Sequence, residues 1–215
     1  ITPTAVFDPI RLCGTTVSRA TLHNQDYIDS LDAGIGDTIV VNKSGEIIPK
    51  VKCVVKEKRK PGTVRFKIGN ACPVCGAPAV RDGDTADMRC TGSRCPAQLE
   101  RRIINFTGRS AMDIKGFGEV YVAELLRAGF IKDISDIYRL REHREELIES
   151  GIIGREKNTD KLLSAIEASK SNDAFRILTG LGIPNVGRSA ARAILRKFGS
   201  IQAVAEASVE ELTEV

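Results

Sequence analysis

The segment CPVC (Cys72–Cys75) is followed, after fourteen intervening residues, by CTGSRC (Cys90–Cys95), and this arrangement decides how the middle of the 215-residue chain can fold. Two short cysteine pairs joined by a stretch of this length can bring four thiolates around one zinc ion. Four thiolates complete the tetrahedral coordination of zinc and leave no position for a water nucleophile. We therefore predict a structural zinc site made of Cys72, Cys75, Cys90 and Cys95.

Two disulfides, or one redox-active CxxC pair, are the alternative uses of these cysteines. Both fit poorly, because nothing resembling a secretory signal precedes the segment and CPVC does not stand at the start of a helix after a strand. The segment 69–97 is poor in apolar residues, so we expect it to be disordered without metal. The remaining cysteines, Cys13 and Cys53, lie in apolar strand-like runs and are expected to be buried free thiols.

The composition is that of a soluble globular protein, with 28% charged and 42% hydrophobic residues. The length allows one large domain or two to three small ones. No run of eighteen apolar residues is present, so we expect no transmembrane helix and no membrane partner. The cysteine usage favours a reducing cytoplasm. A net charge of +4 does not by itself indicate a nucleic-acid partner.

The distribution of charge is more informative than its total. Between Lys50 and Lys67 there are eight basic residues against one acid, Glu57, which is a local balance of +7. The basic residues are Lys50, Lys52, Lys56, Lys58, Arg59, Lys60, Arg65 and Lys67. Such a run forms either a solvated face or a surface for a polyanion.

Residues 1–68 carry short β-branched runs separated by turn signals, which is typical of strands. The runs are LCGTTV (12–17), DTIVVNK (37–43), EIIPKVKCVVKEK (46–58) and TVRFKI (63–68), and the turn signals are Gly36-Asp37, Ser44-Gly45 and Pro61-Gly62. One stretch, from Asn24 to Leu31, has helical character. Several short strands with one helix predict a small β-barrel of the OB-fold type, and such barrels commonly bind nucleic acids.

From Ala97 onward the apolar residues recur at spacings of three and four, which predicts helices. The expected helices are 97–106, 119–128, 134–140, 144–150, 159–170, 173–181, 189–198 and 200–207, and Ser208 with Glu211 forms a capping box that starts another. The chain is therefore predicted to be a multidomain α+β protein, with an OB-fold at 1–68, a four-cysteine zinc finger at 69–97 and an all-α domain at 98–215.

Glycine-bearing turns recur between these helices. They are Ile114–Gly118, Gly151–Gly154 and Ile183–Gly187, and their last glycines are 36 and 33 residues apart. A helix, a tight glycine turn and a second helix make the helix-hairpin-helix pattern, repeated at a roughly constant period.

A turn of this kind suits phosphate. Glycine removes the side chain that would hold an anion away, so N–H groups at the start of the second helix can converge on it. Lys115 and Arg188 add positive charge at two of the turns. Contacts to the backbone of DNA predict binding without sequence preference and with strong salt dependence. The alternative is that the glycines serve only to turn the chain.

Several motifs in order resemble a known family. They are VSRATLHN (17–24), GDTIVVNKSGEIIPKV (36–51), CPVCGAP with RCTGSRCPAQ, SAMDIKGFG (110–118), IEASK (166–170) and LGIPNVG (181–187). Together they resemble the C-terminal portion of bacterial-type NAD-dependent DNA ligases, over essentially the whole chain. The resemblance implies an OB-fold, a zinc finger and four helix-hairpin-helix units that clamp nicked double-stranded DNA against an adenylation domain, in replication and repair.

The resemblance also implies DNA-binding residues. Arg19, His23 and Asn24 would lie on the DNA-facing surface of the barrel, although His23 could instead be a structural histidine at a strand end. Lys43 is either a phosphate contact or a solvated lysine. In the hairpins, the expected contacts are Lys115, Gly116, Gly118, Asn185, Gly187 and Arg188.

The sequence departs from the family in four places. The KxDG motif of the nucleophilic lysine is missing, so we expect no catalytic residue here, inactivity in isolation, and structural zinc as the one cofactor; NAD and magnesium would bind the full-length enzyme. The second hairpin, at Gly154-Arg155-Glu156-Lys157, carries one extra residue, which puts its phosphate contact in doubt. We also expect the fourth hairpin unit to be truncated and a BRCT domain to be missing from this chain.

The expected partners are nicked DNA and the adenylation domain of the same protein, with the chain itself a monomer in the bacterial cytosol, associated with the nucleoid. The alternative function is a stand-alone structural DNA-binding module without catalysis.

Overall fold

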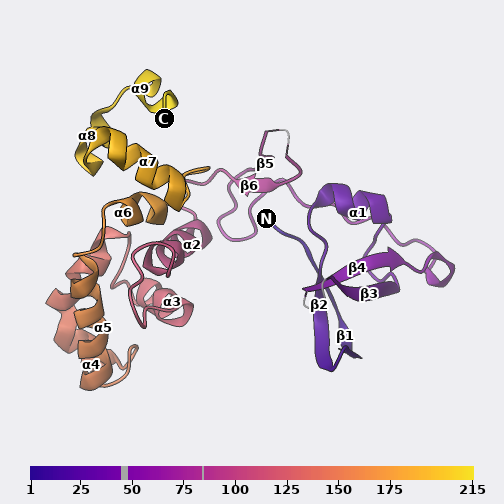
Figure 1. Cartoon of the computed structure of the whole chain (residues 1–215). Helices are drawn as coiled ribbons and strands as arrows, with labels where there is room; N and C mark the ends of the chain where they lie inside the picture. The colour runs from indigo at the N-terminus through magenta and orange to yellow at the C-terminus, as the bar shows by residue number, and fades with distance from the viewer. Residues whose placement is uncertain (45–47, 84) are drawn as a thin grey trace. The chain divides into compact units, whose positions relative to one another are not determined.

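The computed structural model describes residues 1–44, 48–83 and 85–215, and it divides into two compact units, Ile1–Cys95 and Pro96–Val215 (Figure 1). All the described strands belong to the first unit, and the second is helical. Gly45 of the predicted turn Ser44-Gly45, and the first two residues of the predicted run 46–58, lie outside the described residues. Within those residues, no helix has the length and apolar character that crossing a bilayer requires.

The first unit is built on a curled sheet of four described strands in the order β1-β2-β4-β3 (Figure 1). The strands are β1 (Thr4–Leu12), β2 (Thr15–Thr21), β3 (Ile39–Ser44) and β4 (Ile48–Val54). The pairs β1–β2 and β3–β4 are antiparallel, whereas β2 and β4 meet in parallel. Helix α1 (Gln25–Leu31) follows β2, buries Ile28, and packs on β4, where the Tyr27 hydroxyl donates to the Val51 carbonyl at 2.6 Å. This arrangement agrees with the predicted OB-fold.

The predicted run 63–68 does not form a strand of this sheet. It adds only an isolated bridge between Gly34 and Arg65. The Gln25 side chain occupies the next backbone groups, donating to the Phe66 carbonyl at 3.2 Å and accepting from the Ile68 N–H at 2.7 Å. One amide side chain thus takes the place of a neighbouring strand.

The predicted run 12–17 is also not one strand but the turn of the β1–β2 hairpin. Cys13 and Gly14 have φ angles of 47° and 76°, and two consecutive residues with positive φ are typical of a two-residue hairpin loop. Cys13 is exposed, which corrects the expectation that it is buried. The strand β1 that precedes the turn had no counterpart in the sequence prediction.

Cys53 is exposed as well, and a β-bulge explains it. In the β3–β4 pairing, Val40 lies opposite Cys53 and Val41 opposite Val51, so Lys52 is an extra residue. A bulge reverses the alternation of side chains beyond it. Val51 is therefore fully buried while Cys53, two residues on, faces solvent.

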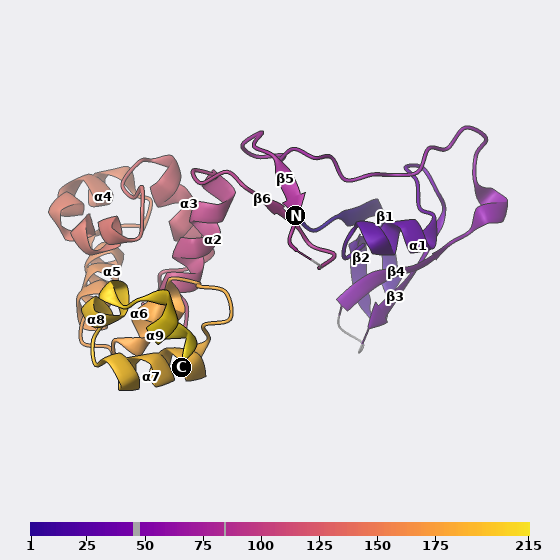
Figure 2. The same cartoon turned by 90° about the horizontal axis from the view of Figure 1, so that it is seen from above.

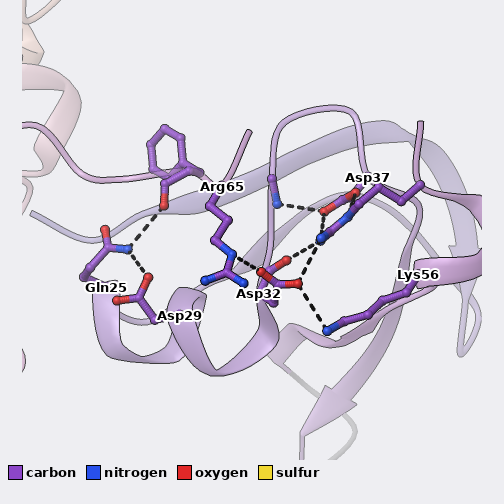
Figure 3. A network of polar contacts seen from close by, with 9 residues as sticks. Gln25, Asp29, Asp32, Asp37, Lys56 and Arg65 are labelled. Atoms are coloured by element: carbon purple, nitrogen blue, oxygen red, sulfur yellow. Dashed lines mark hydrogen bonds and ion pairs between the residues drawn. The ribbon is translucent and has the colours of Figure 1, made fainter. Parts of the chain in front are cut away.

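An ion-pair network joins the loop after α1 to the basic stretch (Figure 3). Arg59, in the turn after the short 3-10 helix η1 (Lys56–Lys58), donates to Asp37 and to Asp32 at 2.8–2.9 Å. Lys56 and Arg65 also pair with Asp32. The Asp37 side chain is fully buried, and the Arg59 hydrogen bonds hold the pKa of both carboxyls below the usual range. Three of the eight cations therefore have structural partners, which reduces the charge available to a polyanion.

The cysteine segment follows within the same unit. It contains a two-stranded antiparallel ribbon of β5 (Ala79–Arg81) and β6 (Met88–Cys90) and an isolated bridge between Ala71 and Pro78. Ala79 is its one buried aliphatic residue outside the cysteines in the described part of 69–95. So little apolar burial cannot hold the segment together by itself, and this leaves the sulfur cluster as its centre.

The second unit consists of helices joined by short turns (Figure 2). They are α2 (Pro96–Thr107), α3 (Glu119–Arg127), η2 (Ser135–His143), α4 (Arg144–Ser150), α5 (Glu156–Ser169), α6 (Phe175–Gly180), α7 (Arg188–Phe198), α8 (Ile201–Glu206) and α9 (Val209–Thr213). The predicted capping box of Ser208 with Glu211 is present at the start of α9. The predicted α-helix 134–140 is instead the 3-10 helix η2, because the Asp133 and Asp136 side chains accept local backbone N–H groups and compete with the α-helical pattern.

The second unit has two apolar clusters. The larger one joins α2, α3, η2, α4 and α5 around fully buried side chains such as Ile103, Leu125 and Leu147. The smaller one joins α6, α7 and α8 around Phe175, Leu178 and Ala191. The helices α6 and α7 and their connecting turn thus have a core of their own.

Candidate functional site

The four predicted zinc ligands lie together. Their Sγ atoms are all within 4.8 Å of one another, with Cys75 and Cys90 at 3.4 Å and Cys72 and Cys95 at 3.9 Å. Sulfurs at about 2.3 Å from one tetrahedral zinc ion would be separated by about 3.8 Å. The donor set and its spacing therefore fit a zinc ion.

Local backbone geometry supports the cluster. A Cβ atom at Gly92 would lie 3.0 Å from the Cys75 sulfur and 3.3 Å from the Cys90 sulfur, so only glycine lets the chain pass this close. The Gly92 N–H donates to the Cys90 sulfur at 3.3 Å. Hydrogen bonds of this type orient and stabilise thiolate ligands.

The thiols do not ionise alike. Backbone N–H groups of Cys75 and Val74 lower the pKa of the Cys72 thiol to about 6. The Ala77 N–H acts to lower the pKa of Cys75, but the contact with the Cys90 sulfur and desolvation outweigh it and raise the pKa to about 12. A cation at the centre of the cluster would favour the thiolate form of every ligand.

Two of the predicted DNA contacts share one open groove on the sheet. Arg19 on β2 and Lys43 on β3 line it together with Thr15, Val17 and Pro49. The Lys43 ammonium donates to the Thr15 hydroxyl at 2.8 Å, while Arg19 is exposed. Two cations therefore line this groove, and neither forms an ion pair within the described residues.

His23 and Asn24 lie at the start of α1 and do not line that groove. The Asn24 side chain accepts from the Tyr27 N–H at 2.9 Å and so serves as the N-cap of α1. The His23 ring contacts the Tyr27 ring edge-on with centroids 4.9 Å apart. Both residues thus have structural contacts, and the exposed His23 ring also faces solvent.

In the first hairpin, Gly116 has a φ of +83° and Gly118 is the N-cap of α3. Across the described chain, the N–H groups of these two glycines donate to no protein acceptor. A Cβ at Gly118 would meet nothing within 4 Å, so its surroundings are open. The Lys115 ammonium, however, is bound to both carboxylate oxygens of Asp113 at 2.8 and 2.9 Å. An incoming phosphate must compete with Asp113 for this lysine.

The hairpin between α6 and α7 repeats the first one position by position. Asn185 has a φ of +65°, in the place of Gly116, and Gly187 is the N-cap of α7, in the place of Gly118. The Val186 N–H donates to the Ile183 carbonyl as the Phe117 N–H donates to the Ile114 carbonyl. The Gly187 N–H has no protein acceptor within the described residues, and the space beside it is open.

The second hairpin differs. Its helix α5 has Arg155 as N-cap, one residue beyond the glycine that the sequence pattern aligned with Gly118. The Gly154 N–H donates to the Gly151 carbonyl at 3.0 Å and is therefore not free for a ligand. Ile153 is buried, and its carbonyl accepts from the Tyr121 hydroxyl at 3.2 Å. These contacts are those of a packing element.

Helix α2 contributes residues that the sequence analysis missed. Arg101, Arg102 and Asn105 line an open groove whose other wall is the hairpin residues Asn185 and Gly187. The Asn105 amide donates to the Thr179 and Gly180 carbonyls, which holds α2 against the end of α6. The sequence signal was the basic pair Arg101-Arg102 on a helix, but a linear pattern does not place it opposite a turn some eighty residues later.

Three parts of the chain match known family models. Residues 1–63 match the OB-fold domain of NAD-dependent DNA ligases, residues 71–97 match the C4 zinc finger domain of the same enzymes, and residues 176–215 match the helix-hairpin-helix motif.

Curated relatives match over the whole chain. A DNA ligase of Clostridium kluyveri is 46% identical, one of Symbiobacterium thermophilum is 47% identical and one of Clostridioides difficile is 44% identical, each over 215 residues. In each case the match covers 100% of this chain and 32% of the relative. The chain thus spans about a third of the length of these relatives.

Proposed function

Because the chain belongs to the family of NAD-dependent DNA ligases, we propose that it is the part of such an enzyme that holds nicked duplex DNA by its phosphate backbone while the nick is sealed. The proposal takes residues 1–68 as the OB-fold domain, 69–97 as the zinc finger and 98–215 as the helix-hairpin-helix domain. It places the protein in the bacterial cytosol, at the nucleoid, as a monomer.

One observation carries the proposal: at the starts of two helices, the N–H groups of Gly118 and Gly187 have no protein acceptor among the described residues, and the space beside each Cα is open. Glycine N–H groups at a helix start can converge on one anion, and the helix dipole favours negative charge there. Gly116 and Asn185 supply the positive φ that each turn needs. Since the contacts would be to phosphates, binding would not depend on base sequence.

The sheet of the first unit supplies further proposed contacts. Arg19 and Lys43 in their common groove suit the phosphates of a strand lying on the sheet. We retain His23 as a contact because its ring is exposed, and Asn24 because its amide nitrogen remains available after its oxygen caps α1. Arg188 at the start of α7 and, less strongly, Lys115 beside Asp113 complete the set.

The zinc ion has a structural role in this proposal. Cys72, Cys75, Cys90 and Cys95 would hold it, and it would supply the folding free energy that the few apolar contacts of the segment lack. Replacing Cys90 or Cys95 by Ser should release the metal and lower the melting temperature. Metal content that is unchanged in both variants would rule out this role.

The chemistry of ligation belongs to other residues of the enzyme. Transfer of adenylate requires a nucleophilic lysine, a site for NAD and a magnesium ion, and the KxDG motif of that lysine is absent from these 215 residues. What this chain would contribute is orientation of the nick against the adenylation domain.

Two experiments test the proposal. Electrophoretic mobility shift with nicked and intact duplex, at low and at physiological salt, should show binding that weakens steeply with salt. Mixing the chain with a separately produced adenylation domain should restore sealing of nicked DNA. Binding without sealing in any mixture would favour the stand-alone DNA-binding module, and salt-independent binding would exclude recognition of phosphates.

A further inference from the structure

The hairpin that ends with Gly187 lies in a stretch without acids. Between Asp173 and Glu206 the chain contains five basic residues and no aspartate or glutamate. The basic residues are Arg176, Arg188, Arg192, Arg196 and Lys197. Arg176 is on α6 and the others are on α7. The two helices of this hairpin therefore carry positive charge, and neither helix contains an acidic residue.

Three of these arginines converge on one aromatic ring. The guanidinium carbons of Arg192, Arg188 and Arg176 lie 4.4, 5.7 and 5.9 Å from the centroid of the Phe175 ring. All three guanidinium carbons therefore lie within 5.9 Å of the same point. The face of the ring attracts each cation but carries no net charge. The ring thus orders the guanidinium groups without neutralising them.

Packing holds this arrangement in place. Phe175 is 8% exposed and belongs to the small core formed with Leu178 and Ala191. The Arg176 guanidinium donates to the Ala111 carbonyl at 2.5 Å, and this bond holds the guanidinium group in one position. Arg188 and Arg192 are exposed and four residues apart on α7, so they point from the same face of that helix.

The described residues offer these three arginines no carboxylate. Other arginines of the chain have one, as Arg127 has Glu124 and Arg144 has Asp160. The ion pairs of the described residues include none with Arg176, Arg188 or Arg192. Asp113, whose carboxyl responds to the charge of Arg176, is already bound by Lys115. Three cations that form no ion pair repel one another, and a bound anion would relieve that repulsion.

We propose that Arg176, Arg188 and Arg192, ordered by the Phe175 ring, form a phosphate-binding cluster that grips the DNA backbone in addition to the glycine N–H groups of the turn. The inference rests on the proposed DNA-binding function and assigns it a second set of contacts. Guanidinium groups bind phosphate oxygens in pairs of parallel hydrogen bonds. Because the ring already orients them, they lose less conformational freedom when phosphate binds.

The test measures binding of the zinc-loaded chain to nicked duplex DNA over a series of salt concentrations. The double variant Arg188→Gln/Arg192→Gln removes two of the three cations. Each lost phosphate contact should reduce the slope of log affinity against log salt by about 0.9, and affinity at low salt should fall roughly 10- to 100-fold.

Matched variants separate the cluster from bulk charge. Arg127→Gln on α3 removes one positive charge from the same unit, away from the cluster, and should change affinity less than about twofold. Arg192→Lys keeps the charge but loses the planar group, and its affinity should lie between those of the wild type and the double variant. Phe175→Leu keeps an apolar side chain and removes the ring, and should also weaken binding. Melting curves of all four variants identify any that fail to fold.

The outcomes are distinguishable. If the wild-type chain does not bind DNA, the proposed function itself fails. If it binds and the double variant matches it in affinity and salt slope, the function stands and the arginine cluster is not a phosphate site. Equal losses in the double variant and Arg127→Gln would likewise overturn the cluster, because bulk charge would then explain them. Should the double variant unfold, an affinity of folded Arg192→Lys equal to wild type would overturn it.

Discussion

The hairpin between α4 and α5 and the hairpin between α6 and α7 share a sequence pattern, yet they use it differently. At Gly154 the N–H is bound within the turn, Ile153 is buried, and Arg144 bridges to Asp160 and Glu156 on the following helix. At Gly187 the N–H has no protein acceptor among the described residues, Ile183 is 44% exposed, and the neighbouring charges are arginines. The same glycine pattern can therefore serve packing in one turn and leave an N–H available to a ligand in another, depending on its surroundings.

The largest contrast should come from one substitution made in both turns. Ile153→Ala should lower the free energy of unfolding by about 3 kcal/mol, because it leaves a cavity beside α3 and α5. Ile183→Ala at the exposed position should cost less than about 0.5 kcal/mol. Denaturant unfolding of the two variants measures both values. Similar losses at the two sites would remove the distinction between the turns.

Alanine at the two glycines should produce opposite effects. Gly154 has a φ of +106°, and a Cβ there would lie 2.8 Å from Asn158 Nδ2, so Gly154→Ala should destabilise the chain by about 1–3 kcal/mol. Its DNA affinity, measured on folded protein, should not change. Gly187 has an ordinary φ of −79° and open surroundings.

Gly187→Ala should accordingly leave stability unchanged. It should weaken binding of duplex DNA roughly tenfold, because the methyl group stands where a phosphate must approach. Titration of labelled duplex with both variants, beside their melting curves, makes the test. The reverse pattern would mean that the two turns have been assigned the wrong way round.

Acid should separate the hairpins too. The Arg144 hydrogen bond lowers the pKa of Asp160, so this pair contributes stability above the unfolded-state pKa of about 3.9 and loses it as pH falls through the lower folded-state value. No acid lies between Asp173 and Glu206.

Hydrogen exchange, corrected for the intrinsic effect of pH, should therefore show residues 144–169 losing protection below about pH 4 while residues 175–198 keep theirs. Simultaneous loss in both segments would indicate that acid acts on the unit as a whole and not on the Asp160 pair.

The smallest effect is expected at Arg155, the exposed N-cap of α5. Arg155→Gln should change DNA affinity less than about twofold, whereas the same substitution at Arg188 should weaken it several-fold. Fluorescence anisotropy with one duplex at one salt concentration compares them. If Arg155→Gln lowered DNA affinity as much as Arg188→Gln, the second hairpin would have to be counted among the DNA contacts.

Short-range signals in the sequence predicted the parts of the molecule that local physics decides. The cysteine spacing, the capping box at Ser208 and the helices with apolar periodicity all depend on residues close in sequence. The members of the cysteine cluster could be named individually because four thiolates within 24 residues leave few arrangements.

Long-range contacts explain what the sequence did not reveal. The Lys52 bulge that exposes Cys53 depends on the register against β3, and the groove that Arg101 shares with Asn185 and Gly187 joins residues far apart in the sequence. Neither effect leaves a periodic trace in the sequence.

The two hydrogen bonds of the Gln25 amide, to the Phe66 carbonyl and the Ile68 N–H, affect how the length of the surrounding connection can vary. A strand ladder shifts every pair when a residue is inserted, whereas a single amide holds two backbone groups and is indifferent to what lies before or after them. The connection from η1 to the β5–β6 ribbon can thus gain or lose residues before Phe66 or after Ile68, while the Gln25 hydrogen bonds still attach this connection to α1.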